Sequence, residues 1–351
     1  MGAERQESGL AAVLWLRCLM ALLAVLAVGS AQAAAPPLSL AWPIDCRLGE
    51  DCWIVHLPDT DPGPAATDFR CGRLTYDGHK GTDIALRDRA ALFRPVPVLA
   101  AAAGTVLGGR DSVADHLGDT SALKAAIDAG RECGNGLTLD HGSGWHTQYC
   151  HLKSGSLRVA KGQRVVAGQM LGHVGQSGAA EFPHLHLSVR HQGQEMAPFT
   201  RLPLGAGCET TAKGSLWTTS VAQTLPTADA PILTAIGFRQ TAPLFDALKQ
   251  DTNSPTTLSA EAPALVLWAM AFGLRAGDTL TFRINDGQGQ TIHAKTFEQP
   301  KDQIRRLQFT GRRNTGWLRP GRYTGTVAIT RQSPAGKAII RQQQVSMQIA
   351  D

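Results

Sequence analysis

Glycine and proline interrupt this chain so often that long regular helices are not expected. The 351 residues include 37 glycines and 19 prolines, and only 6% of the chain is aromatic. No heptad or Gly-X-Y period is present, which excludes a long coiled coil and a collagen. Hydrophobic residues reach 43%, so most of the chain can bury a core and is not intrinsically disordered. We therefore expect a mainly β protein built from short strands and turns.

The positive charge of the chain is concentrated at its C-terminal end. The formal net charge is +5, and residues 301–351 hold ten basic residues against two acidic ones. A charge of this size does not require a nucleic acid, and we expect no such partner. It suits contact with an anionic surface such as a cell envelope, with ordinary solvated arginines as the simpler interpretation.

An apolar stretch near the N-terminus predicts export. Residues 10–28 are interrupted by Arg17, and the uninterrupted part, residues 18–28, is too short to span a bilayer. Its length suits the core of a signal peptide, and residues 31–33 (Ala-Gln-Ala) follow as a cleavage site. We expect residues 1–33 to be a signal peptide and the mature chain to be periplasmic or extracellular, with no transmembrane span. An uncleaved N-terminal anchor is the alternative.

Six cysteines follow that segment, and an even number in an exported chain predicts three disulfides. They are Cys46, Cys52, Cys71, Cys133, Cys150 and Cys208. The spacing favours a small loop closed by Cys46 and Cys52, and an expected hairpin lies between Cys133 and Cys150. Sequence alone does not choose among the pairings. A thiolate zinc site is the alternative, but no C-x-x-C spacing supports it.

Composition divides the chain after the signal peptide into four parts. Residues 34–70 are rich in Pro, Gly and Asp and are interpreted as a cysteine-containing loop region. Residues 71–204 hold alternating runs typical of an antiparallel β-sheet, and residues 205–230 have the composition of a linker. In residues 231–351, strand-like segments separated by Gly and Pro turns predict an immunoglobulin-like β-sandwich.

Two local elements are expected in the second of these parts. Alternating runs at residues 137–140 and 145–150, joined by a glycine-rich turn, predict a hairpin. Residues 118–130 predict the one good helix there, with Thr120 or Ser121 as its cap.

Histidines are concentrated in three patterns within residues 71–204. His79 and Asp83 are four residues apart with a glycine between them, so both side chains can point to one side of a bent segment. His184 and His186 form an H-x-H pair on an expected strand, where alternate side chains share a face. His151 ends the predicted hairpin. Each pattern alone is also typical of surface histidines or simple ion pairs.

Together these groups predict a metal-dependent hydrolase. His79, Asp83 and one histidine of the H-x-H pair would form a three-ligand zinc site with a fourth position open for water, which is the catalytic pattern. The remaining histidines would then serve as base and oxyanion stabiliser. No H-E-x-x-H motif or other Glu-based zinc motif is present, so histidine must take these roles.

The motifs and their order resemble the lysostaphin-like, LytM-type zinc metalloendopeptidases that cut peptidoglycan peptides. The family's patterns correspond to residues 79–83 (H-x-G-x-D), 134–142 (G-N-G to D/H-G), 149–152 (Y-x-H-L), 159–169 (V-x-x-G-x-x-V-x-x-G-Q) and 183–186 (P-H-L-H). The resemblance covers about residues 71–199 and not the C-terminal part.

This resemblance implies a role for each of five residues. His79, Asp83 and His186 become the ligands of one Zn²⁺ per chain, and His151 and His184 become the catalytic histidines beside a metal-bound water. It also implies a compact antiparallel β-sheet with a groove over the metal. We expect a monomer.

The expected substrate is the peptide cross-link of bacterial peptidoglycan. Tyr76 and Tyr149 are candidates to contact a substrate carbonyl, with packing as the alternative for both. The C-terminal domain is a candidate to bind an envelope or regulatory protein.

Two other functions remain open at this point. One is a catalytically silent envelope protein of the same fold that activates a cell-wall amidase, but such relatives have lost metal ligands, which this chain retains. The other is a secreted bacteriolytic protease that cuts Gly-rich peptides, whose groove chemistry would be the same.

Overall fold

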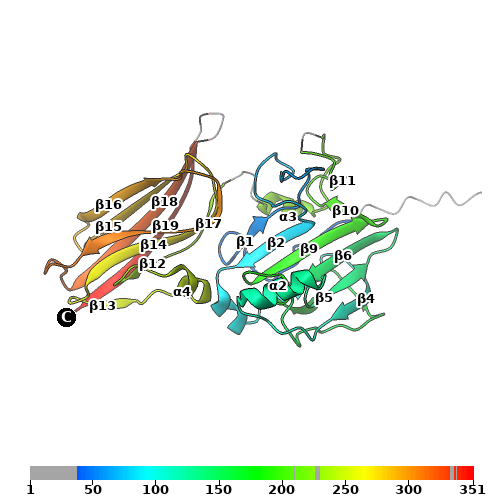
Figure 1. Cartoon of the computed structure of the whole chain (residues 1–351), viewed down its shortest axis with the longest axis horizontal. Coiled ribbons are helices and arrows are strands. Elements are labelled where there is room, and N and C mark those ends of the chain that lie inside the picture. Colours follow the sequence, from blue (N-terminus) through cyan, green and yellow to red (C-terminus); the bar gives the residue numbers. More distant parts are fainter. Residues whose placement is uncertain (1–37, 209, 226–229, 333–335, 337) are drawn as a thin grey trace, which may run out of the picture. The chain divides into compact units, whose positions relative to one another are not determined.

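The computed structural model describes residues 38–208, 210–225, 230–332, 336 and 338–351. The expected signal peptide, residues 1–33, lies outside the described residues. The chain is mainly β, with antiparallel sheets, as the sequence predicts (Figure 1).

Strands between residues 52 and 203 form one large sheet in which neighbouring strands run in opposite directions. In order across this sheet the strands are β1 (Cys52–His56), β2 (Gly81–Leu86), β9 (His184–His191), β6 (Trp145–Cys150), β5 (Gly136–Asp140), β4 (Gly104–Arg110) and β7 (Arg164–Val165). β10 (Gln194–Ala197) pairs with β9 and with β11 (Leu202–Pro203). β3 (Pro97–Leu99) and β8 (Met170–His173) form a separate pair. This order places β2 and β9, which carry most of the expected site, side by side.

The alternation of strand side chains divides this sheet into an apolar and a polar face. Leu185 and Leu187 of β9 and Ile84 of β2 are fully buried in one hydrophobic core. The adjacent residues, including His186 on β9 and Asp83 on β2, therefore point to the opposite face. The core thus fixes which side of the sheet carries the histidines.

The predicted hairpin is present, and the predicted helix has a different cap. β5 and β6 pair in antiparallel register, with Gly136 opposite Cys150. The helix α2 (Thr120–Asp128) begins after Asp119, whose carboxylate accepts hydrogen bonds from the amides of Ser121 and Ala122. An aspartate caps a helix as well as a serine or threonine, and here it stands one residue earlier.

The interpretation of residues 34–70 as a loop region is incomplete, because this segment contains strand β1. All five residues of β1 are buried, and the strand pairs antiparallel with β2. Its Trp-Ile-Val centre is rich in the aromatic and β-branched residues that favour strands. The Pro, Gly and Asp residues on either side of this short run are typical of loops, so the strand was not predicted. The short helix η1 (Arg89–Phe93) lies in the second part, residues 71–204, and α3 (Thr219–Thr224) lies within the expected linker.

Residues 232–350 form two sheets that share one hydrophobic core. The three-stranded sheet has the order β12 (Ile232–Arg239), β14 (Ala264–Leu274) and β17 (Gln303–Arg313). The five-stranded sheet has the order β13 (Thr257–Ser259), β19 (Ala338–Ala350), β18 (Gly321–Gln332), β15 (Thr279–Asn285) and β16 (Thr291–Glu298). A short helix, α4 (Phe245–Gln250), follows β12. The immunoglobulin-like layout of these sheets stays a prediction.

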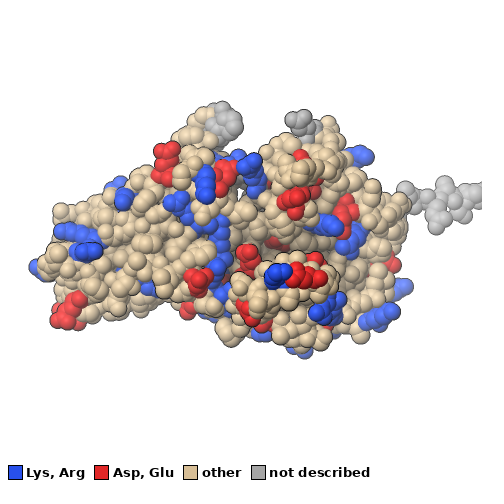
Figure 2. Space-filling model, viewed as in Figure 1, with Lys and Arg blue, Asp and Glu red and all other residues tan. Residues whose placement is uncertain are grey.

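Charged side chains of both signs are spread over the face of the molecule that Figure 2 shows. In the part of the chain that the structure describes, no helix is long and apolar enough to cross a membrane.

Three disulfides join the six cysteines in pairs: Cys46 with Cys52, Cys71 with Cys208, and Cys133 with Cys150. The first anchors the start of β1. The third joins the end of β6 to the segment before β5, and the second links residues that are 137 positions apart.

We expect the long-range disulfide to stabilise the fold more than the short one. Replacing both Cys71 and Cys208 by Ser should lower the free energy of unfolding by about 2–5 kcal/mol, because the open chain gains more conformational freedom when unfolded. The matched control replaces Cys46 and Cys52, which are only six positions apart, and should cost less. Urea unfolding of both variants measures the difference, and equal losses would contradict this prediction.

Candidate metal centre

Sheet pairing brings the carboxylate and one imidazole of the expected site together. Asp83 on β2 stands directly opposite His186 on β9. Directly opposed residues of an antiparallel pair lie on the same face, so both side chains point away from the core. His79 precedes β2 by two residues and completes the group, in which one ligand atom of each residue lies within 4.8 Å of the others.

The atoms of this group converge closely enough to hold one ion. His79 Nε2 lies 3.2 Å from Asp83 Oδ2 and 3.2 Å from His186 Nδ1. His186 Nδ1 lies 2.8 Å from Asp83 Oδ1. Two imidazole nitrogens and a carboxylate form a donor set typical of catalytic zinc.

A second group, Cys46, Asp51 and Cys52, satisfies the same distance limit. Its two sulfur atoms are joined in a disulfide, so they are not available as thiolate ligands. The His79, Asp83 and His186 group is therefore the candidate metal centre of the described residues.

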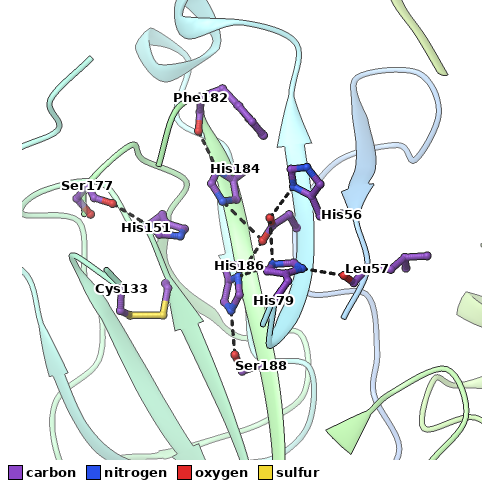
Figure 3. A network of polar contacts seen from close by, with 12 residues as sticks. His56, Leu57, His79, Cys133, His151, Ser177, Phe182, His184, His186 and Ser188 are labelled. Carbon is purple, nitrogen blue, oxygen red and sulfur yellow. Dashed lines mark hydrogen bonds and ion pairs between the residues drawn. A yellow bond between two sulfur atoms is a disulfide. The ribbon is translucent and has the colours of Figure 1, made fainter. Parts of the chain in front are cut away.

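Hydrogen bonds orient both imidazoles of this centre (Figure 3). His79 Nδ1–H donates to the carbonyl of Leu57 at 2.7 Å, which leaves Nε2 facing the centre. His186 Nε2 lies 2.9 Å from the hydroxyl of Ser188, which leaves Nδ1 facing it. Metal-binding histidines usually hold their second ring nitrogen in this way.

The charge of Asp83 calls for a cation at this position. Its side chain is almost fully buried, and its ion-pair partners in the described structure are all imidazoles: His56, His79, His184 and His186. Burial by itself raises the pKa of Asp83, but the imidazoles around it hold this pKa well below its usual value. A buried carboxylate of this kind needs a compensating positive charge.

In the absence of metal, a proton on His79 can supply that charge. Burial lowers the pKa of His79, but the charge of Asp83 and its hydrogen bond outweigh burial and raise this pKa above its usual value. A divalent cation between the same atoms would replace the proton. The buried carboxylate, the two oriented imidazoles and their spacing thus fit a zinc ion.

The other two expected histidines lie beside this centre. His184 is two residues before His186 on β9, so it shares its face, and His184 Nε2 lies 3.6 Å from Asp83 Oδ1. His151 follows β6, and its ring centroid is 4.5 Å from that of His184. The backbone of His151 has a φ of 64°, the left-handed conformation, which turns the chain as the strand ends.

Both of these imidazoles are held as neutral bases. His184 Nδ1–H donates to the carbonyl of Phe182 at 2.8 Å, and His151 Nδ1–H donates to the carbonyl of Ser177 at 2.9 Å. Burial lowers the pKa of His184 and, together with the neighbouring histidines, holds the pKa of His151 well below its usual value. Each Nε2 therefore carries a lone pair at neutral pH.

The two candidate tyrosines occupy different environments. Tyr76 is 47% exposed, and its ring centroid is 4.5 Å from that of His79, so it borders the centre. Tyr149 is fully buried, and its hydroxyl accepts a hydrogen bond from the amide of Ala101 at 2.8 Å. The expected substrate contact at Tyr149 does not fit this position, because its side chain points into the core.

One residue of the centre escaped the sequence reasoning. His56 Nδ1 lies 3.0 Å from Asp83 Oδ2, and His56 is largely buried. It ends β1, which lies in the segment expected from the sequence to be loop. The Trp-Ile-Val run before His56 was the sequence feature that could have indicated this strand.

A cavity of about 420 Å³ opens beside His79. Its lining includes Asp59, Asp77, His79, Lys80, Glu195 and Leu204. Of the three side chains of the candidate centre, His79 is the one that lines this cavity.

The central part of the chain is similar to a family of known proteins. Residues 77–198 match the model of Peptidase family M23. This match confirms the LytM-type resemblance.

Two curated relatives are similar over short segments. "Cell division protein DipM" of Caulobacter vibrioides is 38% identical over 58 residues, which are 16% of this chain and 9% of that protein. "Peptidoglycan DD-endopeptidase ShyA" of Vibrio cholerae is 38% identical over 61 residues, which are 17% of this chain and 14% of that protein. The chain thus matches only a small fraction of the length of these relatives.

The solved structures that are similar to this chain include the catalytic domains of two enzymes. The catalytic domain of lysostaphin from Staphylococcus simulans has a TM-score of 0.25 at 21% identity, covering 34% of this chain and 76% of that one. The catalytic domain of a prophage-encoded M23 protein, EnpA from Enterococcus faecalis, has a TM-score of 0.28 at 22% identity, covering 41% and 88%.

Proposed function

From the M23 peptidase match at residues 77–198, we propose that this protein is an exported zinc endopeptidase that hydrolyses the peptide cross-links of bacterial peptidoglycan. The observation that carries the proposal is the convergence of His79, Asp83 and His186 beside two neutral histidines. One of the relatives is named as a peptidoglycan endopeptidase, which supports this substrate class.

The proposed mechanism assigns the metal to three side chains. His79 Nε2, His186 Nδ1 and the Asp83 carboxylate would hold one zinc ion. When bound, zinc lowers the pKa of water and polarises a scissile carbonyl. The buried position of these side chains strengthens their electrostatic effect, because little solvent screens it.

His151 and His184 carry the proton transfer. Because the Nδ1–H of each ring is bonded to a backbone carbonyl, each Nε2 is a proton acceptor in the neutral ring. Either can therefore take the proton of the attacking water as general base. The ring that has been protonated can then donate to the oxyanion or to the leaving amine.

Export has independent support from the cysteines. Three disulfides form and persist in an oxidising compartment such as the periplasm or the extracellular space. The silent, amidase-activating alternative is less well supported, since the chain retains both the metal-binding group and the two neighbouring histidines. In this proposal the C-terminal sheets bind an envelope or regulatory protein, and the enzyme acts as a monomer.

Cleavage of purified cell walls tests this proposal. Oxidised protein from residue 34 onward, loaded with zinc, is incubated with sacculi that have diaminopimelate or glycine-bridged cross-links, and the fragments are analysed by liquid chromatography and mass spectrometry. We expect cross-linked dimers to decrease, with fragment masses that identify the bond. Asp83→Asn, which keeps the side-chain shape without the charge, should leave them intact. No cleavage of either wall by zinc-loaded protein would favour the silent alternative.

The proposed roles predict that some histidine variants keep zinc but lose activity, whereas others lose both. His151→Ala and His184→Ala should each slow turnover by about 10²–10⁴-fold while zinc stays bound, because they remove a proton acceptor and not a ligand. His186→Ala should lose both zinc and turnover.

His146→Ala is the matched control, because this histidine lies on the neighbouring strand β6 and contacts Asp140 rather than the centre. It should keep wild-type turnover and zinc content. Loss of zinc in the His184 variant, with retention in the His186 variant, would reverse the assignment.

A further inference from the structure

Each side chain of the candidate metal centre has a hydrogen-bonding partner outside the centre. The carbonyl of Leu57 orients His79, and the hydroxyl of Ser188 orients His186. The corresponding partner of Asp83 is His56, whose Nδ1 lies 3.0 Å from Oδ2 (Figure 3). Since an ionised carboxylate only accepts hydrogen bonds, His56 Nδ1–H is the donor.

A β-bulge places His56 at this point. The pairing of β1 with β2 runs in register up to Ile54 opposite Ile84, and it then shifts so that His56, and not Val55, stands opposite Asp83. Two residues of β1 thus oppose one of β2, as in a bulge, which redirects side chains. The side chain of His56 therefore reaches the face that carries Asp83.

Metal binding would leave His56 as the remaining donor to Asp83. His79 Nε2 and His186 Nδ1 must then present lone pairs to the metal, and His184 Nε2 is already an acceptor. Among the ring nitrogens that contact Asp83 in the described structure, only that of His56 keeps its hydrogen.

The surroundings of His56 hold its ring in place. The side chain is only 10% exposed, and its ring centroid is 5.2 Å from that of Tyr76 in an edge-on arrangement. The ring centroid of His79 lies 5.7 Å away. The Cys46–Cys52 disulfide anchors the other end of β1.

We propose that His56 is a positioning residue, which fixes the rotation of the Asp83 carboxylate so that this group faces both ligand nitrogens. His56 precedes the segment that matches the peptidase family, residues 77–198. The upstream strand β1 therefore completes the centre. This inference rests on the proposed zinc-binding function.

Zinc titration of matched variants tests the inference. In His56→Asn the amide nitrogen takes the position of Nδ1 and can still donate, whereas His56→Leu has a similar shape without a donor. His56→Ala provides a second variant without the donor. The zinc dissociation constant is measured by competition with a chelator, and thermal unfolding of the metal-free proteins checks the fold.

We expect His56→Leu and His56→Ala to bind zinc about 10–100-fold more weakly than wild type, the usual effect of losing such a partner. His56→Asn should bind nearly as tightly as wild type, and the metal-free Asn and Leu variants should both stay folded at the temperature of the titration. A purely structural role of His56 would lower the unfolding temperature of the variants without this difference in zinc affinity between His56→Asn and His56→Leu.

Two results separate the inference from the function on which it rests. Wild-type affinity in both His56→Leu and His56→Ala, or equal losses in His56→Asn and His56→Leu, would overturn the role of His56 and leave the zinc peptidase intact. Failure of the wild-type protein itself to bind zinc would overturn the proposed function and this inference with it.

Discussion

The buried carboxylate of Asp83 is the constraint on which this site depends. An ionised group with so little exposure is stable only when positive charge and hydrogen bonds compensate for the lost water. The sheet supplies them from three strands or their flanks: His186 from β9, His79 from the turn before β2, and His56 from β1. The arrangement of these strands is thus also an arrangement of donors around one anion.

In this proposal strand β9 carries both a metal-binding histidine, His186, and a base, His184. Their geometry explains why the two histidines have different roles. Alternation places His184 and His186 on one face of β9, but their distances from Asp83 differ. His186 Nδ1 lies 2.8 Å from Oδ1 of the carboxylate, whereas His184 Nε2 lies 3.6 Å from the same oxygen, and the centroid of the His184 ring is 4.5 Å from that of His151. The hydrogen bond from His184 Nδ1–H to the carbonyl of Phe182 fixes the tautomer of the ring, so Nε2 is a proton acceptor when the ring is neutral.

Short motifs allowed much of this centre to be predicted, because they depend on local geometry. The H-x-G-x-D pattern and the period of two in H-x-H indicated which side chains share a face, and the chain folds accordingly. His56 could not be found in this way, since a β-bulge shifts the register by one residue and leaves no spacing pattern. Tyr149 was a candidate for a substrate contact, with packing as the alternative, and alternation along β6 turns it into the core. The mainly β architecture followed from the abundance of Gly and Pro turns, whereas strand β1 was hidden by the same residues around it.

The central claim is that zinc is held by His79, Asp83 and His186, with His184 beside it. A crystal structure of the zinc-loaded protein, with anomalous data collected at the zinc edge, tests it most directly. The account predicts one zinc ion bonded to His79 Nε2, His186 Nδ1 and an Asp83 oxygen at about 2.0–2.2 Å, with His56 Nδ1 still bonded to the carboxylate. A zinc ion bound elsewhere, or bound by His184 in place of His186, would contradict it.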